Sequence, residues 1–318
     1  MKNTGNFNRT KTTKTTKTTK KSTTKSTTKP TDLKIVEEEI DFEGLCAGAE
    51  EFFVPSEEND GLVSAKMYIP VHDELKPILT EKGMPCGHII HAAGESDTGK
   101  TSFSVDQIIQ TQKIGGFSLY GLTEIKFDIE RAVIMGMDRN KAVFYKPPTL
   151  EALFELGEDR IKRFRDKHPT KPILWIWDSI SATPSEYEMD DTKTNHNMKT
   201  AGAISGMLRR KRHFIDREQV CFLMINRVYT KQTTSPWEKQ TSTYGGKAPK
   251  GFSSIQLEFK RLKGLKVKKK IDGKDVSIPI GMEALIENTK NHLSEPFHKV
   301  QIKIDKYGFV TGDRKLKL

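Results

Sequence analysis

The chain has 318 residues, 35% hydrophobic and 30% charged, with a net charge of +11, enough for one large domain or two small ones with a highly charged surface. It contains no run of 18 apolar residues and no apolar stretch after its basic N-terminus, which excludes a membrane-spanning helix and a secretory signal. Its cysteines, Cys46, Cys86 and Cys221, form no Cys-x-x-Cys pair, which argues against a zinc site or a disulfide framework and favours a cytoplasmic protein.

Most of the net charge lies in a low-complexity tail over residues 1–30. The tail has eight lysines, one arginine and no acid, whereas the other 288 residues carry 44 basic and 42 acidic side chains. With one aromatic residue and no apolar periodicity, the tail is predicted to be disordered. It is either a solubilising tail or a tether that binds phosphate backbones. Nucleic-acid binding by the nearly neutral remainder must therefore come from local patches.

The remaining chain divides into a small N-terminal element over 31–80, a core over 81–310 and a C-terminal tail over 311–318. In the core, nearly continuous apolar runs alternate with helical stretches at 149–167 and 197–218. Apolar runs of this length suit strands that are buried on both faces, so we expect an α/β fold with a mostly parallel sheet flanked by helices. Past residue 254 the apolar runs lack intervening helices and predict an antiparallel extension. The predicted strands are 88–93, 117–120, 142–145, 172–178, 220–226, 255–262, 265–271, 282–288 and 299–304.

A complete phosphate-loop pattern, G-x-x-x-x-G-K-[ST], lies between the first predicted strand and a predicted helix. Its glycines let the backbone N–H groups face phosphates, and the helix dipole favours the same anion. Lys100 is expected to contact the β- and γ-phosphates of ATP, and the Thr101 hydroxyl is expected to bind Mg²⁺. The alternative is a structural glycine turn. The predicted nucleotide-binding residues here are Gly94, Glu95, Ser96, Asp97, Thr98, Gly99, Lys100 and Thr101.

Two carboxylates follow predicted strands. Asp178 ends the strand 172–178, at the edge where parallel sheets bind ligands, so it is expected to hold Mg²⁺ or its water shell. The alternative for Asp178 is a helix cap. Glu124 follows the strand 117–120, which we expect to neighbour the phosphate-loop strand. It is the candidate for orienting and deprotonating water, against the alternative of a surface glutamate.

Two polar segments, 184–197 and 229–247, also follow strand ends, and loops this long are usually functional or disordered. The second mixes basic, hydroxyl and aromatic side chains, as binding of single-stranded DNA requires. Its predicted DNA-binding residues are Tyr229, Lys231, Trp237, Lys239, Tyr244 and Lys247. Two more basic stretches are 209–213, either a solvated helix face or a binding patch, and 260–274, an exposed hairpin that turns at Asp272-Gly273.

Several segments, in order, resemble motifs of RecA-type recombinases, including those of large bacteriophages. Residues 83–90 look like the family's G-L-P-x-G-x-I-x lead into the phosphate loop. Residues 123–128 look like the segment that carries the family's catalytic glutamate and, four residues later, an aspartate near the adenine. Residues 177–182 are similar to its strand-terminal D-S-x-x-A.

The resemblance continues towards the C-terminus. Residues 225–228 resemble the family's I-N-Q-[IV], in which the polar residues sense the γ-phosphate. Residues 244–248 are similar to the T-G-G-x-A that closes its second DNA-binding loop. Residues 290–297 look like K-N-K-x-x-x-P-F, whose lysines reach the ATP of the neighbouring subunit. The resemblance therefore implies that Glu124 activates water and that Lys100 is catalytic, and adds Asp128, Asn226, Arg227 and Lys290 to the nucleotide-binding residues.

The chain also departs from the family pattern. Arg227 stands in place of the glutamine of I-N-Q, and His292 in place of the second lysine of K-N-K. The sequence ends soon after the sheet, so the family's C-terminal domain is expected to be absent, and no helix-and-strand N-terminal arm is recognisable. These departures concern the link between nucleotide and DNA loop and the assembly of filaments.

Together these features predict a DNA-dependent ATPase of the RecA type that uses ATP and Mg²⁺. It is expected to bind single-stranded DNA, to assemble into a filament or ring with ATP between subunits, and to promote homologous pairing and strand exchange in recombination and repair. The alternatives are the ATPase of a replicative helicase or helicase loader, and a regulatory nucleotide-binding protein that does not recombine DNA. The expected location is the cytoplasm, or the host cytoplasm for a viral protein, with no membrane partner.

Overall fold

The computed structural model describes residues 65–124, 126–189, 196–230, 241–271, 274–312 and 314–316. All of these lie in one compact unit, Val54–Leu318. The other unit, Met1–Phe53, lies outside the described residues, and with it the predicted tail 1–30. Most of the predicted element 31–80 is also outside them.

The described part of that element packs into the core of the residues that follow it. It forms the strand β1 (Tyr68–Ile69), which pairs antiparallel with β2 (Met84–Pro85), and the 3-10 helix η3 (Asp73–Ile78). Leu75 and Ile78 of η3 are fully buried and belong to the same apolar cluster as the interior of the sheet.

The remaining strands form one mixed sheet, in the order β12-β11-β10-β9-β3-β7-β6-β4-β5, with β8 paired to β7. The strands β3, β7, β6, β4 and β5 are parallel to their neighbours, and β9 joins β3 in parallel before β9 to β12 continue antiparallel. The prediction of a parallel α/β core with an antiparallel extension is confirmed. The strand bounds are β3 Ile89–Gly94, β4 Phe117–Leu122, β5 Ala142–Tyr145, β6 Ile173–Asp178, β7 Val220–Thr230, β8 Thr241–Thr243, β9 Ile255–Ile271, β10 Lys274–Asn291, β11 Lys299–Asp305 and β12 Gly308–Val310.

One predicted neighbour relation is wrong. β4 does not lie beside the phosphate-loop strand β3, because β7 and β6 are inserted between them. Every residue of β3 and β6 is buried, whereas β5 is only partly buried and forms the sheet edge. The strands that are apolar along their whole length thus occupy the middle, where helices cover both faces.

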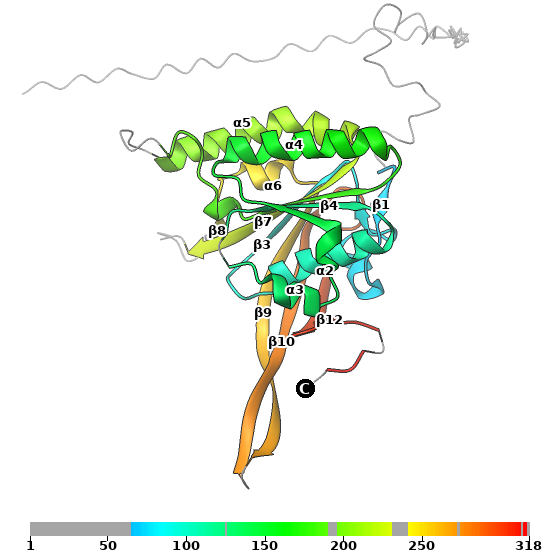
Figure 1. The fold of residues 1–318 in the computed structure, drawn as a ribbon. Helices are drawn as coiled ribbons and strands as arrows, with labels where there is room; N and C mark the ends of the chain where they lie inside the picture. Colours follow the sequence, from blue (N-terminus) through cyan, green and yellow to red (C-terminus); the bar gives the residue numbers. More distant parts are fainter. Residues whose placement is uncertain are drawn as a thin grey trace, which may run out of the picture. The chain divides into compact units, whose positions relative to one another are not determined.

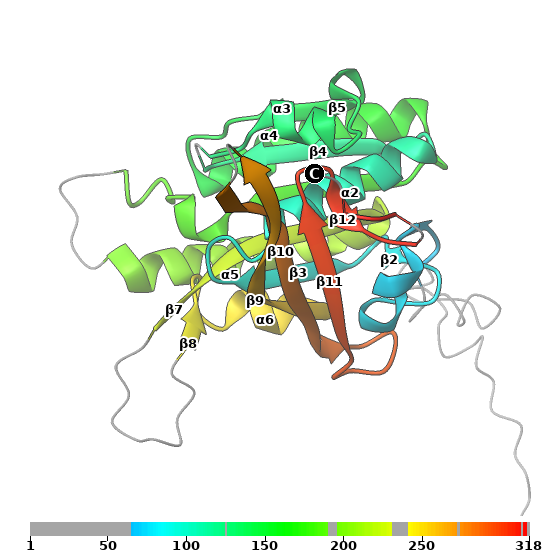
Figure 2. The same cartoon turned by 90° about the horizontal axis from the view of Figure 1, so that it is seen from below.

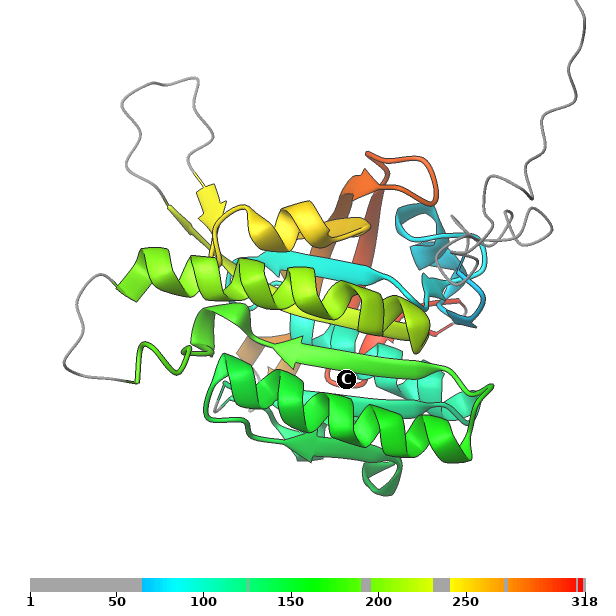
Figure 3. The ribbon, with the colours of Figure 1, turned by 90° about the horizontal axis from the view of Figure 1, so that it is seen from above.

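Helices cover the two faces of the sheet in separate layers. In Figures 1 and 3, α4 (Leu150–Lys167) and α5 (His196–Arg217) run side by side over one face. The phosphate-loop helix α2 (Lys100–Lys113) and the short α3 (Ile129–Ile134) lie on the other face (Figure 1). A further short helix is α6 (Ala248–Phe252), and two further 3-10 turns are η4 (Arg139–Lys141) and η5 (Ile180–Ala182).

Successive residues of the central strands supply two apolar clusters. In β6, Leu174 and Ile176 pack with Phe103 of α2, whereas Trp175 and Trp177 pack with Phe154 of α4. This alternation follows from the two-residue period of a strand. Among the described residues, none of the helices is both long and apolar enough to cross a membrane.

The antiparallel extension is dominated by the ribbon of β9 and β10, whose distal part extends beyond the other strands (Figure 1) and points towards the viewer in Figure 2. The sequence predicted two strands over 255–271, with a break near Gly264. The structure instead has one continuous strand, because Lys263 and Gly264 keep their pairing with Glu283 and Met282. Ile271 pairs with Lys274 as the predicted hairpin requires, while the turn residues 272–273 lie outside the described residues.

Candidate nucleotide-binding site

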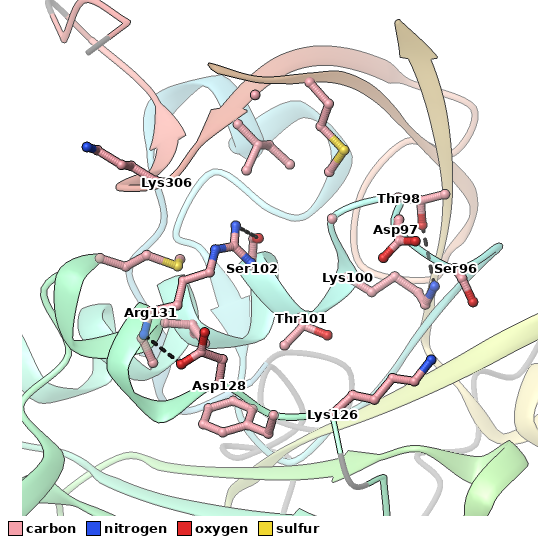
Figure 4. A pocket seen from close by; sticks show the side chains of 18 of the residues that line it. Ser96, Asp97, Thr98, Lys100, Thr101, Ser102, Lys126, Asp128, Arg131 and Lys306 are labelled. Carbon is pink, nitrogen blue, oxygen red and sulfur yellow. Dashed lines mark hydrogen bonds between the residues drawn. The ribbon is translucent and has the colours of Figure 1, made fainter. Parts of the chain in front are cut away.

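A cavity of about 590 Å³ opens beside the carboxyl ends of the central strands, where parallel α/β sheets bind ligands (Figure 4). Residues 96–102, from the phosphate loop and the start of α2, form one wall. Glu124 and Asp178 come from the ends of β4 and β6, and Arg227 from β7. The antiparallel extension closes another side with residues of β9, β10 and β11.

The phosphate loop connects the end of β3 at Gly94 to the start of α2 at Lys100. Gly99 has a φ of 97°, a left-handed conformation that glycine adopts without a steric penalty. A Cβ atom at this position would also press on the side chain of Ile304 in β11. The first turn of α2, whose N–H groups have no partner inside the helix, therefore lies open to the cavity beside a tightly packed glycine.

Lys100 is the buried cation of the site. Its Nζ donates hydrogen bonds to the carbonyl oxygens of Gly94 at 2.9 Å and Glu95 at 2.5 Å. Burial lowers the pKa of Lys100 to about 8, although the negative charges of Asp178 and Glu124 oppose this shift. At neutral pH the side chain is mostly protonated and is held by neutral carbonyls, which a phosphate can replace.

Asp178, the last residue of β6, is buried in the same cavity. Its Oδ2 accepts a hydrogen bond of 2.6 Å from the Tyr120 hydroxyl, which in turn lies 3.1 Å from Ser104 Oγ on α2. Burial raises the pKa of Asp178 to about 6, against the hydrogen bond from Tyr120 that favours the ionised form. This network connects the end of β6 to the phosphate-loop helix.

The residues fit a magnesium ion that takes part of its coordination from substrate phosphates. Mg²⁺ in such sites uses one or two carboxylates, hydroxyl or water oxygens and phosphate oxygens. Asp178 and Thr101 line the same cavity and supply one carboxylate and one hydroxyl. Within the described ranges there is no group of three His, Cys, Asp or Glu side chains that would hold a metal without a substrate.

Glu124 is positioned at the cavity by the pairing of β4 with β6, not by a pairing of β4 with β3. The Thr123 amide donates to the Asp178 carbonyl at 2.9 Å, which extends the β4–β6 pairing and brings Glu124 beside Asp178. One carboxylate oxygen of Glu124 accepts from Ser179 Oγ, and the other lies 2.5 Å from Arg227 Nη2. The Glu124 carboxylate thus contacts Ser179, which directly follows β6, and Arg227 of β7, and these are the two strands that lie between β4 and β3.

Comparison with known sequences agrees with this geometry. Residues 73–309 match the family model of the RecA N-terminal domain, which is well over half of the chain. The chain belongs to the RecA family. It is 28% identical over 224 residues to the RecA protein of Mycoplasma genitalium, covering 70% of this chain and 62% of that protein. It is 26% identical over 223 residues to the RecA protein of Citrifermentans bemidjiense, with the same coverage of each chain.

This RecA-family chain thus spans less than two thirds of the length of these relatives. A third, the RecA protein of Fusobacterium nucleatum, is 27% identical over 223 residues, which are 70% of this chain and 55% of that protein.

Three cations that line the cavity of this RecA-family chain, Arg131, Arg261 and Lys306, were not predicted from the sequence. Asp128 was predicted, and its carboxylate accepts from the Arg131 amide at 3.0 Å, which caps α3. Arg131 itself donates through Nη2 to Ser102 Oγ at 3.1 Å, and Lys306 lies on the same side of the cavity as Arg131 (Figure 4). Arg261 of β9 is another lining residue. No motif marks these cations, since they come together only when the antiparallel extension folds over α2.

Not every predicted nucleotide residue lines this cavity. Gly94 and Glu95 line an adjoining cavity of about 320 Å³. Asn226 is fully buried within β7, and its amide donates to the Tyr244 carbonyl at 2.9 Å. Lys290 lies apart from the cavity, with its Nζ bonded to backbone carbonyls at the end of α6, among them Ser253 at 2.5 Å.

The predicted DNA-binding residues are described only in part. Lys231, Trp237 and Lys239 lie outside the described residues. Tyr229 on β7 and Tyr244 after β8 are both more than 40% exposed, and their ring centroids are 5.0 Å apart. The segment that includes Lys247 follows directly, at the start of α6. The aromatic pair therefore forms an exposed platform where β7 pairs with β8.

Proposed function

We propose that this chain is an ATP-hydrolysing recombinase that binds single-stranded DNA and promotes homologous pairing and strand exchange. The observation that carries the proposal is the cavity in which the phosphate loop meets both carboxylates, in a chain that belongs to the RecA family. An anion at the start of α2 is favoured by the free N–H groups and by the helix dipole.

In this proposal each cavity residue has one task. Lys100 exchanges its carbonyl partners for the β- and γ-phosphates of ATP, because a charge-assisted hydrogen bond is stronger than one to a neutral carbonyl. Thr101 and Asp178 would hold Mg²⁺, which supplies positive charge against the phosphate oxygens. Asp128, Arg131 and Lys306 surround the far side of the cavity and are proposed to contact the nucleoside.

Glu124 is proposed as the general base. It takes a proton from a water molecule while the water oxygen bonds to the γ-phosphorus and the bond from that phosphorus to the β–γ bridging oxygen breaks. The bridging oxygen keeps the electron pair, so the products are ADP and inorganic phosphate. Because phosphoryl transfer depends mainly on positioning and electrostatic stabilisation, the fixed placement of Glu124 beside Asp178 supports this role.

DNA is proposed to bind at the platform of Tyr229 and Tyr244, together with the predicted Lys231, Trp237, Lys239 and Lys247. Bases stack on aromatic rings without regard to sequence, and lysines neutralise the backbone. Asn226 is hydrogen-bonded to the Tyr244 carbonyl and adjoins Arg227, so the nucleotide cavity and the platform share the end of β7. We further propose assembly with ATP between subunits, where Lys290 of one subunit reaches the neighbour's nucleotide.

The direct test is ATP hydrolysis with and without single-stranded DNA. The proposal predicts a basal rate that rises severalfold when DNA is added. Hydrolysis that DNA leaves unchanged would favour a regulatory nucleotide-binding protein. Electron microscopy of the complex with DNA separates filaments from the closed rings expected of a helicase motor.

A further inference from the structure

At the nucleotide cavity, Arg227 forms an ion pair with Glu124, the proposed general base. Arg227 Nη2 lies 2.5 Å from Glu124 Oε2, and both side chains line the cavity. The Glu124 side chain is 18% exposed and that of Arg227 is 37% exposed, so the pair is partly shielded from water. A charge-assisted contact in this setting is stronger than one on an open surface.

The second oxygen of the same carboxylate is also occupied, because it accepts the Ser179 hydroxyl. A general base must accept a hydrogen bond from the water that it deprotonates. With a guanidinium on one oxygen and a hydroxyl on the other, Glu124 is held in place. A carboxylate has about four acceptor positions, so water is not excluded, but the position on Oε2 that Arg227 occupies is open to water only when the guanidinium leaves.

Arg227 is the partner that a nucleotide can remove. Lys100 and Arg227 both line the cavity, so a γ-phosphate held by Lys100 lies within the same group of charges. A guanidinium matches the oxygens of a phosphate in a two-pronged contact, and a γ-phosphate carries more negative charge than a carboxylate. ADP lacks this group and offers no equivalent competitor for Arg227.

We infer that Arg227 holds Glu124 in an ion pair, and so keeps it from acting as the base, until a γ-phosphate draws Arg227 away. We call this ion pair the latch. The inference rests on the proposed ATP hydrolysis and adds its regulation: a triphosphate releases the glutamate, whereas a diphosphate leaves it paired. The family's glutamine at this position has no charge to pair with Glu124, so the latch is a property of the arginine in this chain.

The test measures binding rather than turnover. Dissociation constants for ADP and for a non-hydrolysable imido analogue of ATP are determined by calorimetry for wild type, Glu124→Gln, Arg227→Gln and the double variant. In Glu124→Gln the latch is broken and Arg227 is free, so the preference for the triphosphate over ADP should rise about fivefold, the upper end for partly exposed ion pairs. In the Arg227→Gln background, the same Glu124→Gln change should leave that preference within twofold.

An equal rise in both backgrounds would overturn the latch, because it would show only relief of repulsion between Glu124 and the phosphate. Wild type that binds neither nucleotide would instead refute the proposed ATP function, and the latch with it. Thermal unfolding verifies that each variant is folded. Arg227→Met, also neutral and of similar length, replaces Arg227→Gln if that variant does not fold.

Discussion

At the scale of single residues, the phosphate contact proposed for Lys100 can be tested by changing the pH, because the charge of this lysine changes near neutral pH. Burial lowers the pKa of Lys100 to about 8. Phosphate binding requires the protonated form, so above pH 8 nucleotide binding must be accompanied by proton uptake. The affinity for a non-hydrolysable ATP analogue should therefore fall as pH rises from 7 to 9.

Calorimetry in buffers with different ionisation enthalpies measures this proton uptake directly. Lys100→Ala is the control, and it should bind nucleotide weakly and without the pH dependence. Equal affinity of the wild type at pH 7 and pH 9, with no proton uptake, would show that Lys100 does not carry the phosphate contact.

Glu124→Gln tests the proposed base. A neutral amide cannot take a proton from water, so hydrolysis should fall by roughly 10²–10⁴ while ATP binding persists. Glu130→Gln is a matched control, since Glu130 is an exposed glutamate on the neighbouring helix α3. Steady-state phosphate release measures both variants, and Glu124→Gln turnover within about threefold of wild type would remove Glu124 from this role.

At the scale of elements, β7 joins the cavity that Arg227 lines to the Tyr229–Tyr244 pair that is proposed to bind DNA. Tyr229 lies on β7 and Tyr244 directly follows β8, the antiparallel partner of β7, and the two rings are in contact. If the rings stack on bases, Tyr244→Ala should weaken binding of single-stranded DNA roughly five- to a hundredfold. Fluorescence anisotropy of a labelled oligonucleotide measures this. Tyr244→Phe keeps the ring and should bind like wild type, so loss of binding in both variants would exclude stacking as the cause.

The elements themselves were largely predictable, because apolar runs and a phosphate-loop pattern are local signals. The strands β3, β6 and β7 begin within one residue of the predicted positions, and α4 and α5 lie within one residue of the predicted helices. The order of strands was not predictable in the same way. β4 was expected beside β3, but which strands take the middle of a sheet is decided by packing of both faces.

The site was predictable only where a motif marks it. The sequence indicated the phosphate loop, Asp178 and Glu124, and residues 96–101 of the loop line one cavity with the two carboxylates. It gave no sign of the Arg227–Glu124 contact, because the two residues lie 103 positions apart and meet only through the order β7-β6-β4. Lys306 was missed for the same reason, since it comes from the turn between β11 and β12.

At the scale of the whole molecule, the charge is divided unevenly between the tail and the rest. Residues 1–30 carry nine of the eleven net positive charges. If these lysines touch phosphates, deleting residues 1–30 should make the slope of log affinity for DNA against log salt shallower, by about 0.7 for each lost contact with a single strand. Basal hydrolysis should not change.

A matched control keeps the length of the tail and replaces its eight lysines and Arg9 by glutamine. Both variants should show the same shallower slope in anisotropy titrations at several salt concentrations. An unchanged slope in both would mean that the tail makes no contact with DNA.

The measurement that tests the central claim most directly is strand exchange between a labelled single strand and a homologous duplex, followed by fluorescence energy transfer. The wild type with ATP and Mg²⁺ should exchange homologous strands, fail with an unrelated duplex, and lose exchange in Lys100→Ala. A wild type that binds DNA and hydrolyses ATP, yet exchanges no strands or unwinds duplexes regardless of homology, would contradict the recombinase proposal.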